Sequence, residues 1–208
     1  EIMPSLVGSE MCIRDRLLPN GQLPLNIFEP RYLNMVLDAL GGTRLIGMVQ
    51  PLPGSDTERP ELHRTGCAGR IISFSETRDG RLLIVLGGVS RFDIVSDFEI
   101  QRGYRIAHVC WDRFAHDMVL EEIQLEKELL LESVRAYLRH QKLSVEWKSL
   151  EILEIPELVD TLACSLPFSP REKQGLLEAP VVEDRYHLVK ALCEFGIGFS
   201  GDTGTQAH

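Results

Sequence analysis

Lysine is missing from the first 115 residues, although this stretch carries 13 arginines. Long apolar runs are missing too: none reaches the roughly 18 residues of a membrane span, so no span is predicted. No basic residue precedes the short apolar stretch Leu6-Val7-Gly8, so no secretory signal is expected. The five cysteines show no paired spacing, which predicts reduced thiols and a cytoplasmic protein.

Catalytic signatures are absent as well. The sequence has no Gly-x-x-x-x-Gly-Lys-Ser/Thr loop, no His-Glu-x-x-His helix and no Gly-x-Ser-x-Gly elbow. We therefore expect no enzyme activity, no cofactor and no metal. A net charge of −9 and a pI of about 5.2 disfavour general binding to nucleic acid.

Charge is distributed unevenly along the chain. Residues 1–115 carry 13 arginines against 14 acids, whereas residues 116–208 carry 9 basic residues against 17 acids. This change predicts two structural units that meet near residue 115. The acidic face of the second unit is expected to be a solvated bundle surface.

The first sixteen residues match neither unit. Residues 1–16 lack hydrophobic periodicity, and residues 9–16 look like translated adapter sequence. We interpret 1–16 as a non-native scar, the alternative being an ordinary variable N-terminus. A scar would leave Cys12 unpacked against the rest of the fold.

The first unit combines one helix with several strands. Pro30 opens a helix and Gly41-Gly42 is expected to end it with a left-handed cap. Asp79-Gly80 predicts a hairpin turn, and Gly87-Gly88 is expected to break the strand after it. Strands at this spacing favour a small barrel or sandwich. They are expected at Leu45 to Val49, Cys67 to Ser75, Arg81 to Leu86, Phe92 to Val95 and Tyr104 to Trp111.

The second unit is helical by its periodicity. A first helix is expected from Met118 to His140, and Pro156 opens a second through Leu166. Ser169-Pro170-Arg171-Glu172 is a capping box that starts a third helix, ending at Leu177. A fourth runs from Val182 to Phe195, and a polar tail follows.

Four segments together resemble the LON N-terminal domain, the substrate-binding region of the ATP-dependent Lon proteases. They are Leu23 to Tyr32, Gly66 to Ile71, Gly87 to Phe92, and Leu166-Pro167 followed by Glu172 to Glu178. No single segment is decisive, but their order and spacing make the match strong. They span nearly the whole chain from Leu17 to Gly196.

The resemblance implies an α+β fold, with a PUA-like β-barrel domain at 17–115 and a C-terminal helical bundle at 116–197. Residues 198–208 are expected to be a flexible tail. Family members begin with a strand that the scar-like segment replaces here, so the barrel is expected to lack its first strand and to keep an unpaired edge. Lon proteases add an ATPase and a Ser-Lys peptidase, neither of which this sequence contains. The chain therefore resembles the stand-alone LON-domain proteins of bacteria.

Candidate binding residues come from the helix start, the strands and the unit boundary: Arg31, Tyr32, Arg70, Arg91 and Trp111. The helix dipole opposes Arg31, so it needs a partner, either Glu29 or a barrel carbonyl, in a bridge that pins helix to barrel. Direct contact with a client peptide is the alternative, and Tyr32 is expected to pack beneath the guanidinium. Arg70 and Arg91 predict ion pairs within the barrel. Trp111 predicts packing between the units, with partner binding as the alternative.

Two further groups of residues contain side chains of the kinds used in metal binding or acid–base chemistry. His108, Cys110 and His116 are too few and too scattered for a metal site, and His63 with Cys67 is similarly weak. Carboxylates at 93, 97 and 99 share one strand parity and are expected on a solvated sheet face.

Three functions are considered, and the sequence does not separate the third from the first. The first is a non-catalytic module that binds unfolded or exposed apolar polypeptide, for which an open sheet edge could add an extended peptide. The second is an RNA-binding PUA-like module, which the balanced charge of the first unit disfavours. The third is a subunit that docks on a protein partner without touching clients.

Overall fold

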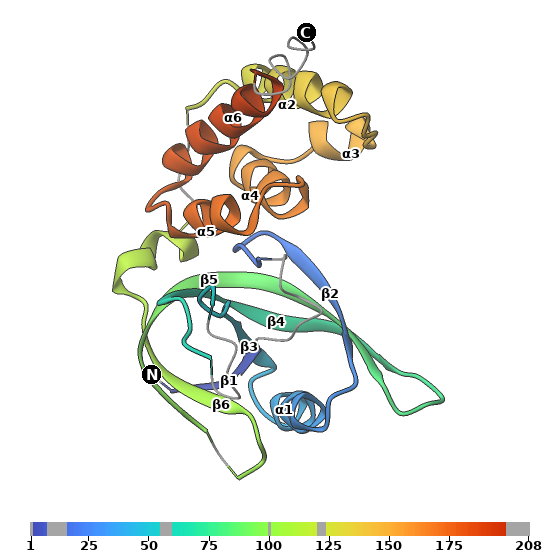
Figure 1. Ribbon diagram of the computed structural model, residues 1–208, viewed down its shortest axis with the longest axis vertical. Coiled ribbons are helices and arrows are strands. Elements are labelled where there is room, and N and C mark those ends of the chain that lie inside the picture. The colour runs from blue at the N-terminus through green and yellow to red at the C-terminus, as the bar shows by residue number, and fades with distance from the viewer. Residues whose placement is uncertain (1, 8–15, 55–59, 100, 120–123, 199–208) are drawn as a thin grey trace, which may run out of the picture.

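The structure is a computed structural model that describes residues 2–7, 16–54, 60–99, 101–119 and 124–198. It is an α+β chain in which a mostly antiparallel sheet is followed by helices (Figure 1). The sheet part contains β1 (Ile2–Val7), β2 (Gln22–Ile27), α1 (Pro30–Leu40), β3 (Leu45–Met48), β4 (Thr65–Glu76), β5 (Leu82–Glu99) and β6 (Arg105–Cys110).

Strand β5 organises the sheet, whose order is β2-β5-β4-β3-β1-β6 with an additional β5–β6 pairing. Its first part, Leu82 to Gly87, pairs with β2 and its last part, Asp93 to Glu99, pairs with β6, while β4 pairs with it from Leu82 to Asp93. The expected break at Gly87-Gly88 is wrong, as is a separate strand from Phe92, because β5 is continuous. A register shift beside Gly88 absorbs the glycines, and a Cβ there would lie 1.8 Å from the Leu18 carbonyl oxygen.

The N-terminal segment differs from the expectation for a scar. Ile2–Val7 forms β1, which pairs in parallel with β3 and antiparallel with β6. The position of the expected missing strand is therefore occupied. Arg16, placed in the scar by the sequence, is buried, and its Nε donates to Gln174 Oε1 at 3.4 Å. Cys12 and the 199–208 part of the expected tail lie outside the described residues.

One face of the sheet packs on α1. Leu23, Leu25 and Ile27 alternate inward from β2 and belong to the same buried apolar cluster as Met35 and Val36 of the helix. Pro30 opens α1 as predicted, but Gly41 has ordinary right-handed dihedrals. The left-handed residue after the helix is Arg44, with φ of 60°. The predicted glycine cap is therefore wrong.

The α+β class is confirmed, whereas the expected PUA-like barrel is not closed. Within the described part of the chain, strand β2 pairs with β5 alone and forms one edge of the sheet. Pro24 lies in this edge strand, where its missing N–H removes a donor. Natural proteins use such prolines to limit pairing with another chain.

The remaining elements are helical. They are the 3-10 helix η2 (Asp112–Met118), α2 (Lys127–His140), α3 (Trp147–Glu151), α4 (Ile155–Ser165), α5 (Pro170–Glu178) and α6 (Val182–Gly198). The capping box is confirmed, since Ser169 Oγ accepts from the Glu172 amide and the Glu172 carboxylate accepts from the Ser169 amide. Helix α2 starts later than expected, the short α3 was not expected, and residues 120–123 lie outside the described residues. Among the described residues, no helix is long and apolar enough to cross a membrane.

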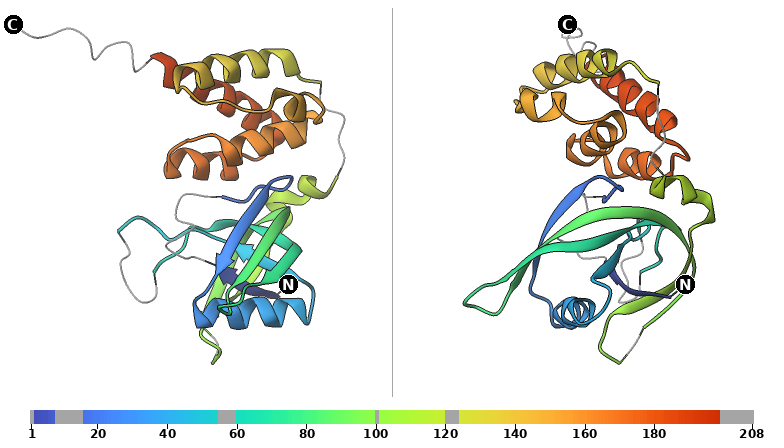
Figure 2. Two further views of the ribbon diagram at one scale, coloured as in Figure 1. Left: turned by 90° about the vertical axis from the view of Figure 1, so that its right-hand side faces the viewer. Right: turned by 180° about the vertical axis from the view of Figure 1, so that it is seen from behind.

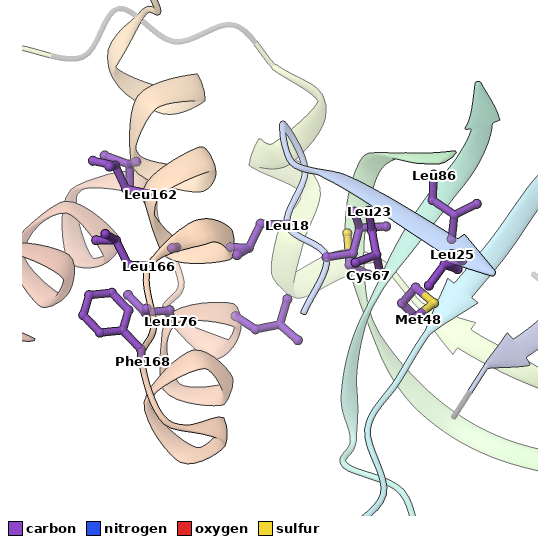
Figure 3. Close-up of a cluster of buried hydrophobic side chains, with 14 of the residues drawn as sticks. Leu18, Leu23, Leu25, Met48, Cys67, Leu86, Leu162, Leu166, Phe168 and Leu176 are labelled. Atoms are coloured by element: carbon purple, nitrogen blue, oxygen red, sulfur yellow. The ribbon is translucent and has the colours of Figure 1, made fainter. Parts of the chain in front are cut away.

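The helices stack at one end of the sheet, on the side opposite α1, with α5 nearest the strands (Figures 1 and 2). A single apolar cluster runs through both parts. Figure 3 shows Leu18 between the helical part, with Leu166 after α4 and Leu176 in α5, and the strands that carry Leu23 and Cys67. The segment before β2 thus joins the sheet to the helices.

Candidate functional site

Arg91 lies at the junction of sheet and helices, not on the surface. Its side chain is 1% exposed, and its Nε and Nη2 bind the Asp117 carboxylate at 2.9 and 2.7 Å. Nη1 and Nη2 also donate to the carbonyls of Leu177, Ala179 and Pro180. The predicted ion pair therefore exists, but its acid comes from η2 and its carbonyl partners from the end of α5. Arg91 is inaccessible to a client.

A second buried pair continues the junction. Arg185 Nε donates to Asp160 Oδ1 at 2.8 Å, and the other Asp160 oxygen accepts from the side chain of Asn20 at 3.0 Å. Burial raises the pKa of Asp160, while Arg185 and Asn20 act to lower it. The carboxylate thus links α4 and α6 to the turn before β2. Sequence reasoning missed this pair, whose members lie 25 residues apart.

Trp111 packs on the sheet. Its ring meets Phe92 edge to face with centroids 5.7 Å apart, beside a small cluster that includes Val49 and Val109. Its Nε1 is buried and has no hydrogen-bond partner among the described residues. The side chain is half-buried, so it offers a partner less area than its size suggests.

Arg31 and Arg70 remain accessible. Arg31 Nε donates to Glu29 Oε2 at 2.9 Å, and its guanidinium lies 4.7 Å from the centroid of the Tyr32 ring. Glu29 and Tyr32 are thus the predicted partners, but Glu29 adjoins the same helix, so this bridge does not pin the helix to the barrel. Arg70 has no ion pair among the described residues, contrary to the predicted one, and Nη1 reaches only the Thr43 carbonyl at 3.5 Å.

The carboxylates of β5 serve as ion-pair partners. Asp93 is buried and accepts from Thr65 Oγ1 at 2.7 Å, with Arg113 3.5 Å away. Asp97 binds Arg105, beside an open cavity of about 360 Å³. The expectation of a solvated face is wrong for Asp93. Among the described residues, no group of His, Cys, Asp and Glu could hold a metal ion.

The sequence reasoning also missed an apolar surface on the hairpin that joins β4 to β5. Ile72, Phe74 and Leu83 are 53%, 56% and 44% exposed. Phe28 is exposed nearby, with the Arg81 guanidinium 5.9 Å from its ring centroid. We call these four the hairpin group. The sequence did contain a sign of this surface. Apolar residues occur at both odd and even positions of β4 next to the predicted turn, so they point to both faces of the strand and some of them must lie outside the core.

This hairpin projects from the body, away from the helices, in both Figure 1 and the right-hand view of Figure 2. Strand β3 accompanies β4 only as far as Arg70. From Ile72 to Glu76, β4 pairs with β5 alone among the described residues. The hairpin group therefore lies beside a second sheet edge, in a strand that contains no proline.

Comparison with known proteins agrees with this architecture. A family model, the ATP-dependent protease La (LON) substrate-binding domain, matches residues 11–192. The Lon protease of Dictyoglomus thermophilum is 23% identical over 199 residues, covering 92% of this chain and 25% of that protein. Lon protease 2 of Sorangium cellulosum is 27% identical over 186 residues, covering 85% and 23%. The chain thus spans about a quarter of these relatives.

Solved structures show the same fold. A Lon N-terminal domain protein from Xanthomonas campestris matches with a TM-score of 0.66 and 22% identity, covering 92% of this chain and 98% of that one. The N-terminal domain of a Lon protease of the Mycobacterium avium complex gives 0.63 and 14%, covering 93% and 98%. The resemblance seen in the sequence is confirmed. The chain belongs to the family of the ATP-dependent protease La (LON) substrate-binding domain.

Proposed function

We propose that this protein binds exposed apolar segments of unfolded polypeptides, reversibly and without catalysis, and so assists protein quality control or proteolysis. The observation that carries the proposal is the hairpin group: three large exposed apolar side chains on one projecting hairpin of a LON substrate-binding domain, with the exposed Phe28 beside it. Exposed apolar groupings of this kind are typical of binding surfaces. A cytoplasmic location fits the same role.

The accessible part of the original candidate set fits beside this surface. Arg70 lies on β4 near Ile72, where its exposed guanidinium can meet client carboxylates or carbonyls. Arg31, in the first turn of α1, is a secondary candidate, whereas Tyr32 is buried beneath its guanidinium. Arg91 is assigned a structural role because it is buried and saturated with acceptors.

The test is fluorescence anisotropy with a labelled, reduced and carboxymethylated lactalbumin, an unfolded chain, and single-stranded poly-uridine in parallel. Saturable binding to the polypeptide alone is expected, with affinity on the order of micromolar because the client must be ordered. Binding to RNA alone, weakening steeply with salt, would support the RNA-binding alternative. Binding to neither would favour docking on a folded partner.

Variants locate the surface. Phe74→Ser and Leu83→Ser are each expected to weaken client binding about tenfold, the cost of roughly half an apolar side chain's burial. Ile152→Ser is the matched control, since Ile152 is 79% exposed but follows α3 in the helical part. Equal losses in all three variants would contradict the assignment to the hairpin.

A further inference from the structure

The free edge of β4 has a definite hydrogen-bonding direction. The amide of Ile71 donates to the Arg44 carbonyl at 2.9 Å, so Ile71 points its backbone away from β5. At the turn, the Thr77 amide donates to Arg81 at 2.9 Å, so Thr77 points toward β5. In an antiparallel ladder the backbone N–H and C=O groups of successive residues face the partner strand and the opposite side in turn. Because Ile72 is the extra residue at the register shift, the backbone groups of Phe74 and Glu76 face away from β5.

Strand β2 gives the same answer independently. Pro24 pairs with Val85 and has no N–H, so it fits a position whose backbone faces away from β5. Val85 then faces β4, where it pairs with Ser73. Phe74, the next residue, again faces the free edge. The hydrogen bonds of Ile71 and Thr77 and the position of Pro24 thus place the Phe74 backbone on the same side.

We propose that an extended client polypeptide binds as an added strand along Ile72–Glu76 of β4, with its main chain paired to Phe74 and Glu76. This proposal rests on the proposed function and assigns its site and binding mode. Main-chain pairing is indifferent to sequence, which suits a protein that meets many clients. The apolar side chains of Ile72 and Phe74 flank the edge on its two faces, since Ile72 lies beside Gly87 and Phe74 pairs with Ile84, and they favour clients that carry apolar residues.

Charge at the two ends of the edge sets the direction of the added strand. Arg70 is exposed at its start and Glu76 at its end, and neither has an ion pair among the described residues. An antiparallel client places its amino-terminal side near Glu76 and its carboxyl-terminal side near Arg70. Clients with a basic residue before the apolar segment and an acidic residue after it are therefore favoured. The β2 edge, which contains Pro24, is the unfavourable alternative.

The experiment uses the full chain and a labelled peptide of about eight residues, a usual strand length, that alternates valine with threonine between an amino-terminal lysine and a carboxyl-terminal glutamate. Two further peptides carry N-methyl groups on the valine amides or on the threonine amides. Because only alternate amides of an added strand face β4, one methylated peptide is expected to bind at least tenfold more weakly than the other. Exchanging the terminal charges is expected to weaken binding severalfold.

Amide hydrogen exchange locates the site. Bound peptide is expected to protect the amides of Phe74 and Glu76 and to leave the β2 amides unchanged. Equal binding by both methylated peptides, or protection elsewhere, would overturn strand addition while leaving polypeptide binding intact. Failure of the unfolded lactalbumin and the peptide alike would overturn the proposed function itself. Protection of Phe74 and Glu76 without peptide, rising with protein concentration, would show a second copy on the edge and overturn the client assignment.

Discussion

Arg91 and Arg185 donate to one backbone oxygen, the carbonyl of Ala179. Arg91 comes from the sheet and Arg185 from α6, and each is also paired with a buried carboxylate. The segment between α5 and α6 is thus held from both sides. Two guanidinium groups and two carboxylates balance in charge, which lets the junction stay buried without an unpaired ion.

Arg91→Met is expected to lower the free energy of unfolding by about 3–5 kcal/mol, because it leaves the buried Asp117 carboxylate without its counter-ion and the Leu177 and Pro180 carbonyls without the guanidinium donor. Chemical denaturation measures the change. Arg64→Met is the matched control, since Arg64 is largely exposed and 4.0 Å from its acid, and should cost less than about 1 kcal/mol. Similar losses for both variants would mean that the junction contributes no special stability.

The Asp160–Arg185 pair should show strong coupling. Asp160→Leu and Arg185→Met each leave a buried charge alone and are expected to cost about 3–5 kcal/mol. The double variant removes both charges, so it should be more stable than the sum of the single losses predicts, by about 1–3 kcal/mol. A double-mutant cycle in urea measures this difference. Strict additivity would show that the two side chains stabilise the fold independently.

Gly88→Ala tests the close contact between β5 and the segment before β2. The added Cβ would lie 1.8 Å from the Leu18 carbonyl oxygen, so backbone must move, at a cost of about 3 kcal/mol. Gly42→Ala is the control, because its nearest neighbour would be 3.5 Å away. Thermal unfolding of both variants separates the two cases. Tolerance of Gly88→Ala would mean that this contact is loose.

Local sequence signals predicted the elements that depend on short-range physics. Pro30, the Asp79-Gly80 turn and the Ser169 capping box act within a few residues, and each appears in the structure as expected. The strand break predicted at Gly87-Gly88 was wrong because glycine occurs both at strand ends and where another backbone segment comes close. Only the fold shows that the Leu18 backbone lies against Gly88. The family resemblance supplied the order of sheet and helices.

The site depended on long-range contacts, which a single sequence does not show. The sequence predicted that Arg91 makes its ion pair within the barrel. Its carbonyl partners at the end of α5 and just after it are 86 to 89 positions away, so the sequence alone did not indicate them. The hairpin group was missed because an apolar strand predicts a core until its neighbours are known. Strand β3 extends along β4 only as far as Arg70, and this limited pairing leaves Ile72 and Phe74 exposed.

His63 should titrate below its ordinary range. Burial lowers its pKa from 6.5, and the Arg16 charge lowers it further, while Glu178 opposes them. The folded state then binds fewer protons than the unfolded state, so His63 contributes stability that is present above pH 6.5 and is lost as pH falls through the folded pKa. NMR titration of the ring measures this pKa. Arg16→Gln should raise it, and an unchanged value would remove Arg16 as a cause.

Removal of residues 1–7 tests whether the N-terminal segment completes the sheet. Strand β1 lies between β3 and β6, so its loss would leave both with an unpaired side. Amides of Leu45–Met48 and Arg105–Cys110 are expected to exchange at least about tenfold faster in the shortened protein, because local opening costs less at an edge. The amides of β2 pair only with β5 and serve as the internal control. If β3 and β6 exchange at unchanged rates, β1 contributes nothing to the sheet, as the scar interpretation of residues 1–16 predicts.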